Sequence, residues 1–344
     1  ILGANIKKKN GKYKVFGIPP GALFEPTKSL DFGNSGTLAR LLIGILSSTP
    51  RINIKIKGDH SLSKRNMSEL ISLMTEFGAT FLPKNKFKLP FKLISSPMPV
   101  GIKYKAGVSA QLKSAVILAG LNSYGNTLIS EEKKSRDHTE NLLKRNSQSI
   151  KIKNVNKKTI TIMGKKFLKP LNINIPGDVS SSAFFAALTI LSTNSEIRIK
   201  DVGLNPTRIG FYLLLKKVNA KIKFLSLKKK NNELRGDIFV KSSKIKPILA
   251  TSEYYVNSTD EYPILFVIAA LTKGTSVFKG ISDLKNKESD RIKEMQKILR
   301  QIGIKTKNDK NSLKIFGQGL IDASKRKIYV PNLGDHRICM ASFV

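Results

Sequence analysis

The chain has 344 residues, of which 40% are hydrophobic, and its formal charge at pH 7 is +37. This length can bury a sizeable core, most simply in two domains. The apolar runs are too short to cross a bilayer, the single cysteine excludes an intrachain disulfide, and the start does not resemble a signal sequence. The three histidines lack the spacing of a metal site. We therefore expect no membrane segment and no metal, and the reducing conditions of the cytoplasm fit the cysteine usage.

The high positive charge does not by itself indicate a protein that binds nucleic acid. The 61 basic residues are 12 arginines and 49 lysines, and the lysines are scattered along the whole chain. A nucleic-acid surface predicts clustered basic residues interleaved with aromatics, whereas the densest runs here, "KKKNNELR" and "IKKKNGKYK", fall in turns between expected strands. A basic nucleic-acid-binding module is kept as an alternative. The few arginines are more informative, because lysine cannot replace a planar fork for carboxylate or phosphate.

One pattern recurs along the chain: a helix, a small turn residue, a strand, a polar turn and a second strand. The chain opens on the end of such a unit at residues 1–18, and further copies cover residues 70–94, 142–164, 213–240 and 295–317. Gly3, Gly78, Asn219 and Gly303 occupy corresponding places. The spacing predicts a repeated α/β subdomain, longer than the ~20–50 residues of most solenoid repeats.

A second helix is predicted in four places, each headed by glycine, serine, asparagine or aspartate. These segments are residues 33–46, 107–121, 177–191 and 257–271. Their nearly continuous apolar residues predict buried helices, and their polar heads predict N-caps. For any single copy simple capping is the better explanation, but four copies together favour helix N-termini whose unpaired N–H groups bind anions.

The segment "NINIPGD" predicts a boundary between two lobes, residues 1–175 and 176–344. Since the chain begins within a repeat and stops within an apolar helix, we expect both lobes to be truncated. Near the end, "KNKESDRIKEM" (residues 285–295) packs Lys287, Glu288 and Arg291 into what we predict to be one helical turn, forming either a solvated salt-bridge face or a charged site.

Nine phrases occur in an order that resembles the EPSP synthase family of 3-phosphoshikimate 1-carboxyvinyltransferases. They are "LDFGNSGTLARLL", "GDHSLSKRNM", "SAQLKSAVILAGL", "SRDHTENLL", "PGDVSSSAFFAALTI", "NPTRIGF", "DEYPILFVIAAL", "KNKESDRIKEM" and "GDHRICMASF". The resemblance implies a two-lobed inside-out α/β barrel of repeated subdomains. It also implies transfer of the enolpyruvyl group of phosphoenolpyruvate to the 5-hydroxyl of shikimate 3-phosphate, without a cofactor. The main rival is the sister transferase that acts on UDP-N-acetylglucosamine.

The resemblance also implies roles for individual residues. Asp260 matches the base for the 5-hydroxyl, with a helix N-cap as its alternative role and Glu261 as its rival, and Glu288 matches a proton carrier at the vinyl carbon. The phosphoenolpyruvate-binding residues implied by the resemblance are Gly36, Arg65, Gln111, Arg291 and Arg337. Those implied for shikimate 3-phosphate are Ser109, Ala110, Gln111, Arg136, Asp260 and Lys287.

Other matched residues receive no substrate role. Arg40 and Arg208 are interpreted as structural, His138 and His336 as residues that orient a neighbour, and Cys339 as packed and inert. The family's opening segment, with its lysine, serine and arginine, and a later active-site lysine have no counterpart in these 344 residues, which we therefore expect to have impaired activity on their own. In this family glyphosate occupies the phosphoenolpyruvate site, and glycine at position 36 predicts sensitivity to it. A monomer is expected.

Overall fold

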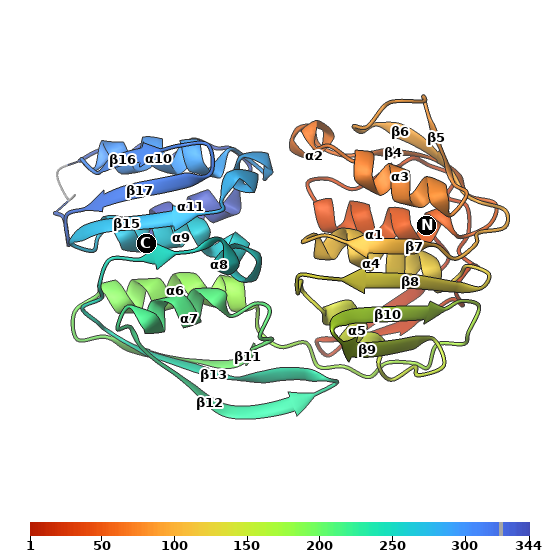
Figure 1. Cartoon of the computed structure of the whole chain (residues 1–344), viewed down its shortest axis with the longest axis horizontal. Coiled ribbons are helices and arrows are strands. Elements are labelled where there is room, and N and C mark those ends of the chain that lie inside the picture. The colour runs from red at the N-terminus through yellow and green to blue at the C-terminus, as the bar shows by residue number, and fades with distance from the viewer. Residues whose placement is uncertain (323–325) are drawn as a thin grey trace. The chain divides into compact units, whose positions relative to one another are not determined.

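The computed structural model describes residues 1–322 and 326–344, which form two compact units, Ile1–Asn172 and Ile173–Val344. The division falls close to the lobe boundary expected at residues 175 and 176. Each unit is built from α/β repeats (Figure 1).

Two four-stranded sheets of the first unit share one topology. The first contains, in spatial order, β3 (Leu30–Asp31), β4 (Asn53–Lys57), β6 (Phe91–Ile94) and β5 (Thr80–Leu82). The second contains β7 (Lys103–Ala106), β8 (Asn126–Glu131), β10 (Lys157–Met163) and β9 (Ile150–Val155). In both, the first two strands are parallel and the last two form an antiparallel hairpin. A separate hairpin, β1 (Asn5–Lys9) and β2 (Lys12–Phe16), opens the chain.

The helices of the first unit lie against these sheets and against one another. They are α1 (Gly36–Ser47), α2 (His60–Lys64), α3 (Ser68–Glu76), α4 (Ala110–Gly120) and α5 (His138–Leu143). Helices α1 and α4 pack side by side (Figure 1). A Cβ atom at Gly44 would lie 2.6 Å from the carbonyl oxygen of Ala115, so glycine is what allows the two helices to touch. This contact brings the N-terminal turns of α1 and α4 into one neighbourhood.

The second unit repeats the same topology once in full. Its sheet contains, in order, β14 (Leu249–Ala250), β15 (Gly274–Lys279), β17 (Ser312–Gly317) and β16 (Lys305–Asn308). A three-stranded sheet contains β11 (Glu196–Gly203), β13 (Glu233–Lys241) and β12 (Lys221–Lys230), with a parallel bridge from Gly177 to Val202 beside it.

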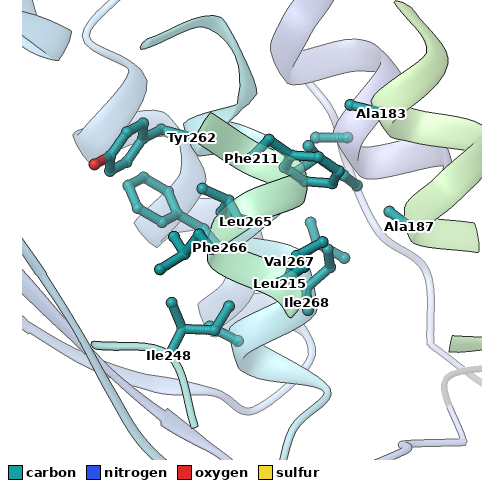
Figure 2. Packing of buried hydrophobic residues seen from close by; sticks show 14 of the residues in the cluster. Ala183, Ala187, Phe211, Leu215, Ile248, Tyr262, Leu265, Phe266, Val267 and Ile268 are labelled. Carbon is teal, nitrogen blue, oxygen red and sulfur yellow. The ribbon is translucent and has the colours of Figure 1, made fainter. Parts of the chain in front are cut away.

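Helices form the interior of the second unit. They are α6 (Val179–Leu191), α7 (Gly210–Lys217), α8 (Ser252–Ser258), α9 (Tyr262–Ala270), α10 (Arg291–Gln301) and α11 (His336–Phe343), with the 3₁₀ helices η1 (Thr259–Glu261) and η2 (Ser282–Asn286). Every residue of α9 is buried. In Figure 2, Leu265 and Val267 of α9 lie among Phe211 of α7 and Ala183 of α6. Since each large apolar side chain contributes ~1.5–3 kcal/mol when fully buried, this all-apolar helix is the natural centre of the core.

The turn residues of the predicted repeat share an uncommon backbone conformation. Gly3, Gly78, Asn219 and Gly303 have φ values of 97°, 94°, 75° and 84°. Glycine and asparagine adopt this left-handed region with the least strain, and it ends helices α3, α7 and α10 before the following strand. The inside-out α/β repeat predicted from the sequence is therefore present in both units.

Two local predictions need correction. Ser35, Ser109 and Asp178 cap α1, α4 and α6 as expected, but α9 has no side-chain cap, because η1 precedes it directly. Asp260 lies within η1 and does not cap a helix. Residues 287–290 are not helical either, since η2 ends at Asn286 and α10 begins at Arg291, capped by Asp290.

Candidate functional site

The N-terminus of α1 holds the first group of candidate residues. A Cβ atom at Gly36 would lie 2.7 Å from Nη1 of Arg65, so the arginine side chain runs directly over the glycine. Arg65 follows α2, and its Nη2 donates to the Asn34 side-chain oxygen at 3.3 Å. Nη1 of Arg40 donates to the Gly36 carbonyl oxygen at 3.1 Å. Two guanidinium groups therefore surround one helix N-terminus, an arrangement suited to an anion.

The N-terminus of α4 adjoins that of α1. Ser109 caps α4, Ala110 begins it, and Gln111 lies in its first turn. The side-chain amide of Gln111 donates to the hydroxyl of Thr37 in α1 at 2.8 Å. The structure thus joins Gln111 to the group around Gly36, whereas its predicted contact with substrate stays a prediction.

Arg136 lies in the half-buried loop between β8 and α5. Its neighbour Ser135 is buried and donates from its backbone N–H and its hydroxyl to Oε1 of Glu131, at 2.9 and 2.5 Å. Helix α5 is also joined to α4, by a 2.8 Å hydrogen bond that links the hydroxyls of Thr139 and Ser114. The loop that carries Arg136 is therefore anchored from both sides.

Arg291 is the centre of the second group, in the second unit. Its side chain is 2% exposed, and its Nε and Nη2 donate to the two carboxylate oxygens of Asp335 at 2.9 and 3.3 Å. Nη2 also donates to Oε2 of Glu288 at 2.6 Å. Within the described residues Nη1 has no hydrogen-bond partner and lies 3.8 Å from Oδ1 of Asp260. One guanidinium thus connects both predicted catalytic acids.

Asp260 lies between two arginines. Nη1 of Arg208 donates to its Oδ2 at 3.1 Å, whereas Nη1 of Arg291 lies nearest the other carboxylate oxygen, Oδ1. Arg208 is itself buried and donates to the hydroxyl of Ser180, which donates to Glu261. Asp260 is 26% exposed at the side chain, whereas Glu261 is 1% exposed. Between the two adjacent acids, only Asp260 is open enough to meet a ligand.

The electrostatics of the cluster favour the charged forms. Burial alone would raise the pKa of Asp335, but hydrogen bonds and charge from Arg291 hold it below its ordinary value. The pKa of Arg291 is raised by its acidic partners despite burial. Asp335 also accepts from the backbone N–H of Arg337 at 3.1 Å at the start of α11, so it connects two of the predicted phosphoenolpyruvate-binding arginines.

Lys287 lies outside the group of contacts around Arg291. Its ammonium group lies 2.5 Å from Oδ2 of Asp283, which also accepts from the hydroxyl of Tyr255 at 2.9 Å. Because residues 287–290 are not helical, Lys287 does not share a helical face with Arg291 as the sequence had suggested. The prediction was wrong because the spacing of three and four residues between these side chains was interpreted as helical.

Two residues of the second group carried no predicted role in it. Arg208 was interpreted as structural, although the "NPTR" phrase had already singled it out, and Asp335 belongs to the matched "GDHR" phrase. Cys339 was predicted to be packed, and this is wrong: the buried positions of α11 are Ile338 and Ala341, and Cys339 is exposed. His138 and His336 begin α5 and α11 and are both exposed, so their orienting roles stay predictions.

Three further findings concern the described part of the chain. No group of three or more His, Cys, Asp or Glu side chains there could hold a metal ion. No helix among those residues is long and apolar enough to cross a membrane. Two surface pockets of the first unit, lined by residues 21–25 with Pro50 and Arg51 and by one face of α3 with Phe87, contain none of the candidate residues.

Comparison with known proteins identifies the family of the chain. The sequence model of the EPSP synthase family, described as 3-phosphoshikimate 1-carboxyvinyltransferase, matches residues 1–344. The chain belongs to the EPSP synthase family. It is 37% identical over 346 residues to the 3-phosphoshikimate 1-carboxyvinyltransferase of Zymomonas mobilis, covering 99% of this chain and 76% of that protein. The corresponding protein of Desulforamulus reducens is also 37% identical, over 100% of this chain and 79% of its own length.

Solved structures agree with this family membership. EPSP synthase from Acinetobacter baumannii superposes with a TM-score of 0.80 at 33% identity, covering 99% of this chain and 77% of that one. The enolpyruvyl transferase NikO from Streptomyces tendae gives a TM-score of 0.69 at 14% identity, over 99% of this chain and 77% of its own, which shows a common fold. The chain therefore has the enolpyruvyl transferase fold.

Proposed function

We propose that this protein transfers the enolpyruvyl group of phosphoenolpyruvate to the 5-hydroxyl of shikimate 3-phosphate and releases phosphate. The carbon–oxygen bond forms between the 5-hydroxyl oxygen and C2 of phosphoenolpyruvate while C3 gains a proton. Loss of a proton from C3 and departure of phosphate from C2 then give the enol ether. The reaction balances without a cofactor, and it needs groups that accept and deliver protons at two different atoms.

The observation that carries this proposal is the connection of Asp260 and Glu288 through one buried guanidinium. Asp260 is the base for the 5-hydroxyl, and Glu288 is the proton carrier at C3. Both carboxylates are partly exposed, at 26% and 21%, whereas Arg291 beneath them is 2% exposed. Proton transfer needs a carboxylate that reaches the reacting atom and is fixed in direction, and positioned acids and bases typically contribute ~10²–10⁴-fold.

Phosphoenolpyruvate carries a phosphate and a carboxylate, and the predicted arginines suit both. In the first unit, Arg65 and Gln111 present donors beside Gly36, where the absence of a side chain lets an anion approach the backbone. In the second unit, Nη1 of Arg291 is a buried donor without a hydrogen-bond partner among the described residues, so a bound anion would satisfy it. Arg337 adds a third positive charge.

Shikimate 3-phosphate is bound by Ser109, Ala110 and Gln111 at the start of α4 and by Arg136. Unpaired N–H groups at a helix N-terminus favour a phosphate, and an arginine adds a charge-assisted contact. For the second unit, the family resemblance assigns Lys287 to the same substrate. Asp260 completes the set by accepting from the 5-hydroxyl.

The test is release of inorganic phosphate by the purified full protein. We expect release only when both phosphoenolpyruvate and shikimate 3-phosphate are present, with the enol ether detected by mass spectrometry. Phosphate release that requires UDP-N-acetylglucosamine instead of shikimate 3-phosphate would favour the sister transferase. Retention of a DNA or RNA probe at physiological salt, with no turnover of either substrate pair, would favour a nucleic-acid-binding module.

We further propose that the enzyme acts as a monomer in the cytoplasm. The single cysteine, which excludes an intrachain disulfide, is compatible with a reducing compartment. Sedimentation of the purified protein tests the oligomeric state, and fractionation of the source cells tests the compartment.

A further inference from the structure

Four buried charges form a closed cluster inside the first unit, away from the residues assigned to substrate. They are Lys113 of α4, Glu131 of β8, Glu140 of α5 and Lys158 of β10. Lys113 Nζ lies 2.8 Å from Oε1 of both glutamates, and Lys158 Nζ lies 3.1 Å from Glu131 and 3.0 Å from Glu140. The side chains are 0%, 1%, 1% and 14% exposed. Two positive and two negative charges thus leave the cluster neutral.

Such a cluster is not explained by stability. Removing two ion pairs from water carries a large desolvation cost, and well-packed apolar side chains of similar volume often serve as well or better. Elsewhere along α4, Leu112, Val116 and Ile117 contribute to the apolar core of the first unit. Charged side chains can form directional bonds to particular neighbours, and apolar side chains cannot. We therefore attribute the cluster to the bonds that it forms.

The directional bonds lead to the two segments that carry the shikimate 3-phosphate residues. Glu131 holds Ser135 through its backbone N–H and its hydroxyl, and Ser135 immediately precedes Arg136. Lys113 stands two residues after Gln111 on α4. Glu140 belongs to α5, which follows the Arg136 loop, and the Ser114–Thr139 hydrogen bond runs beside it. In Figure 1, α4, β8, α5 and β10 are the elements that surround this place.

We propose that the four-charge cluster of Lys113, Glu131, Glu140 and Lys158 is a positioning device that fixes the Arg136 loop relative to the N-terminus of α4, and so sets the geometry in which shikimate 3-phosphate is bound. This inference rests on the proposed function of Ser109–Gln111 and Arg136. None of the four side chains touches substrate. A phosphate that is held at once by a helix N-terminus and an arginine on another segment needs both at a fixed separation, and a misplacement of about 1 Å can cost ~10²-fold.

The decisive variant replaces the whole cluster by apolar residues, Lys113→Met, Glu131→Leu, Glu140→Leu and Lys158→Met, because a single replacement would leave a buried charge unpaired. We expect a melting temperature near that of the wild type. We expect the Kd and KM for shikimate 3-phosphate to rise at least tenfold, with the KM for phosphoenolpyruvate changed less than threefold. A merely structural cluster would move both KM values together or neither, and wild-type binding of shikimate 3-phosphate would overturn the proposal.

A second variant covers the case in which the first does not fold. Lys113→Met with Glu140→Leu removes the ion pair between α4 and α5 but leaves the Ser114–Thr139 hydrogen bond, and it leaves Glu131 paired with Lys158 and bonded to Ser135. It should raise the KM for shikimate 3-phosphate by about three- to tenfold, and an unchanged value would contradict the inference. Glu132→Gln is the matched control, since this adjacent acid forms only an exposed pair with Lys105, and it should leave both KM values unchanged.

Failure of the proposed function has a different signature. A wild-type protein that neither binds shikimate 3-phosphate in calorimetry nor releases phosphate in its presence would refute the function itself, and with it the role assigned to the cluster. A wild type that does both, with an apolar variant that does both equally well, would refute the cluster's role alone.

Discussion

Arg208 donates from Nη1 to Oδ2 of Asp260 at 3.1 Å, and it does so from the turn before α7, whereas Arg291 begins α10. The planar fork of Arg208 serves two partners at once, since Nη2 donates to Ser180. A chain so rich in lysine keeps arginine at this position because an ammonium group cannot hold Asp260 and Ser180 in the same fixed geometry. Asp260 is thus oriented by its surroundings before any substrate binds.

Arg208→Lys should therefore lower kcat about ten- to a hundredfold while the KM values for both substrates change less than about threefold, because the charge is kept and the orientation of Asp260 is lost. Steady-state kinetics with both substrates varied provide the measurement. Arg198→Lys is the control: Arg198 forms an exposed pair with Asp237 in the same unit, and its replacement should have no kinetic effect. Equal losses of kcat in Arg208→Lys and Arg198→Lys would show that Arg208 acts only on stability.

Glu288→Gln should lower kcat by at least roughly a hundredfold while binding of both substrates persists. Glutamine keeps the shape and an oxygen that can accept from Arg291, but it cannot carry the proton to C3. Glu196→Gln, in an exposed pair with Lys241, should behave as the wild type. Near-normal turnover of Glu288→Gln would mean that Glu288 serves only as a salt-bridge partner of Arg291.

Arg291→Lys should chiefly weaken phosphoenolpyruvate, with a KM raised tenfold or more, because lysine cannot reproduce the two-point contact with Asp335 and also direct a donor at the ligand. A fall in melting temperature should accompany it, since Asp335 would be left buried with a poorer partner. The KM for shikimate 3-phosphate measures the selectivity of the effect. A larger rise in that value than in the phosphoenolpyruvate value would contradict the assignment of Arg291.

The pH dependence of stability should report on Glu131. Burial alone would raise the pKa of this carboxyl, but hydrogen bonds from Lys113 and Ser135 lower it from 4.5 to about 2. A folded-state pKa below the unfolded value stabilises the protein above pH 4.5, and the stabilisation is lost as the pH falls toward 2. Between pH 5 and pH 3 the wild type should lose about 2 kcal/mol more of unfolding free energy than Glu131→Gln.

Chemical denaturation at the two pH values checks this expectation. Glu132→Gln serves as the comparison, because Glu132 is exposed, and it should follow the wild-type loss closely. A wild type and a Glu131→Gln variant with parallel losses would mean that Glu131 is not held in its charged form by the cluster.

Much of the fold was predictable because its signals are local. The left-handed turn residues Gly78 and Gly303 and the apolar α9 follow from backbone sterics and burial. The partners of Arg208 and Asp335 were not predictable, because they come from segments 52 and 44 residues away in the chain. The prediction for Lys287 was wrong for a different reason. It assumed that Lys287 and Arg291 lie in one helix, but Asp290 is the N-cap and the helix begins only at Arg291.

The structure gives a different reason for the effect of Gly36 on glyphosate binding from the one expected from the sequence. From the sequence, a methyl group at this position would intrude on the inhibitor. In the structure, a Cβ atom would first meet Nη1 of Arg65 at 2.7 Å and Nη1 of Arg40 at 2.9 Å. Both contacts are at the ends of flexible side chains, so alanine can be accommodated if the guanidinium groups move. That movement displaces a donor for the anion as well as filling space.

Gly36→Ala should therefore weaken both ligands of this site, and glyphosate more than phosphoenolpyruvate. The inhibitor is longer than the substrate and has less room to shift, and one misfitting methyl-sized group costs ~1–3 kcal/mol, or roughly 5- to 150-fold. We expect a raised KM for phosphoenolpyruvate and a ratio of inhibition constant to KM that rises at least fivefold. Gly17→Ala is the control, since a Cβ atom there meets nothing within 4 Å. A wild type that already resists glyphosate, or an alanine variant in which both constants rise by the same factor, would mean that other residues discriminate between the two anions and that Gly36 serves only to let Arg65 cross the start of α1.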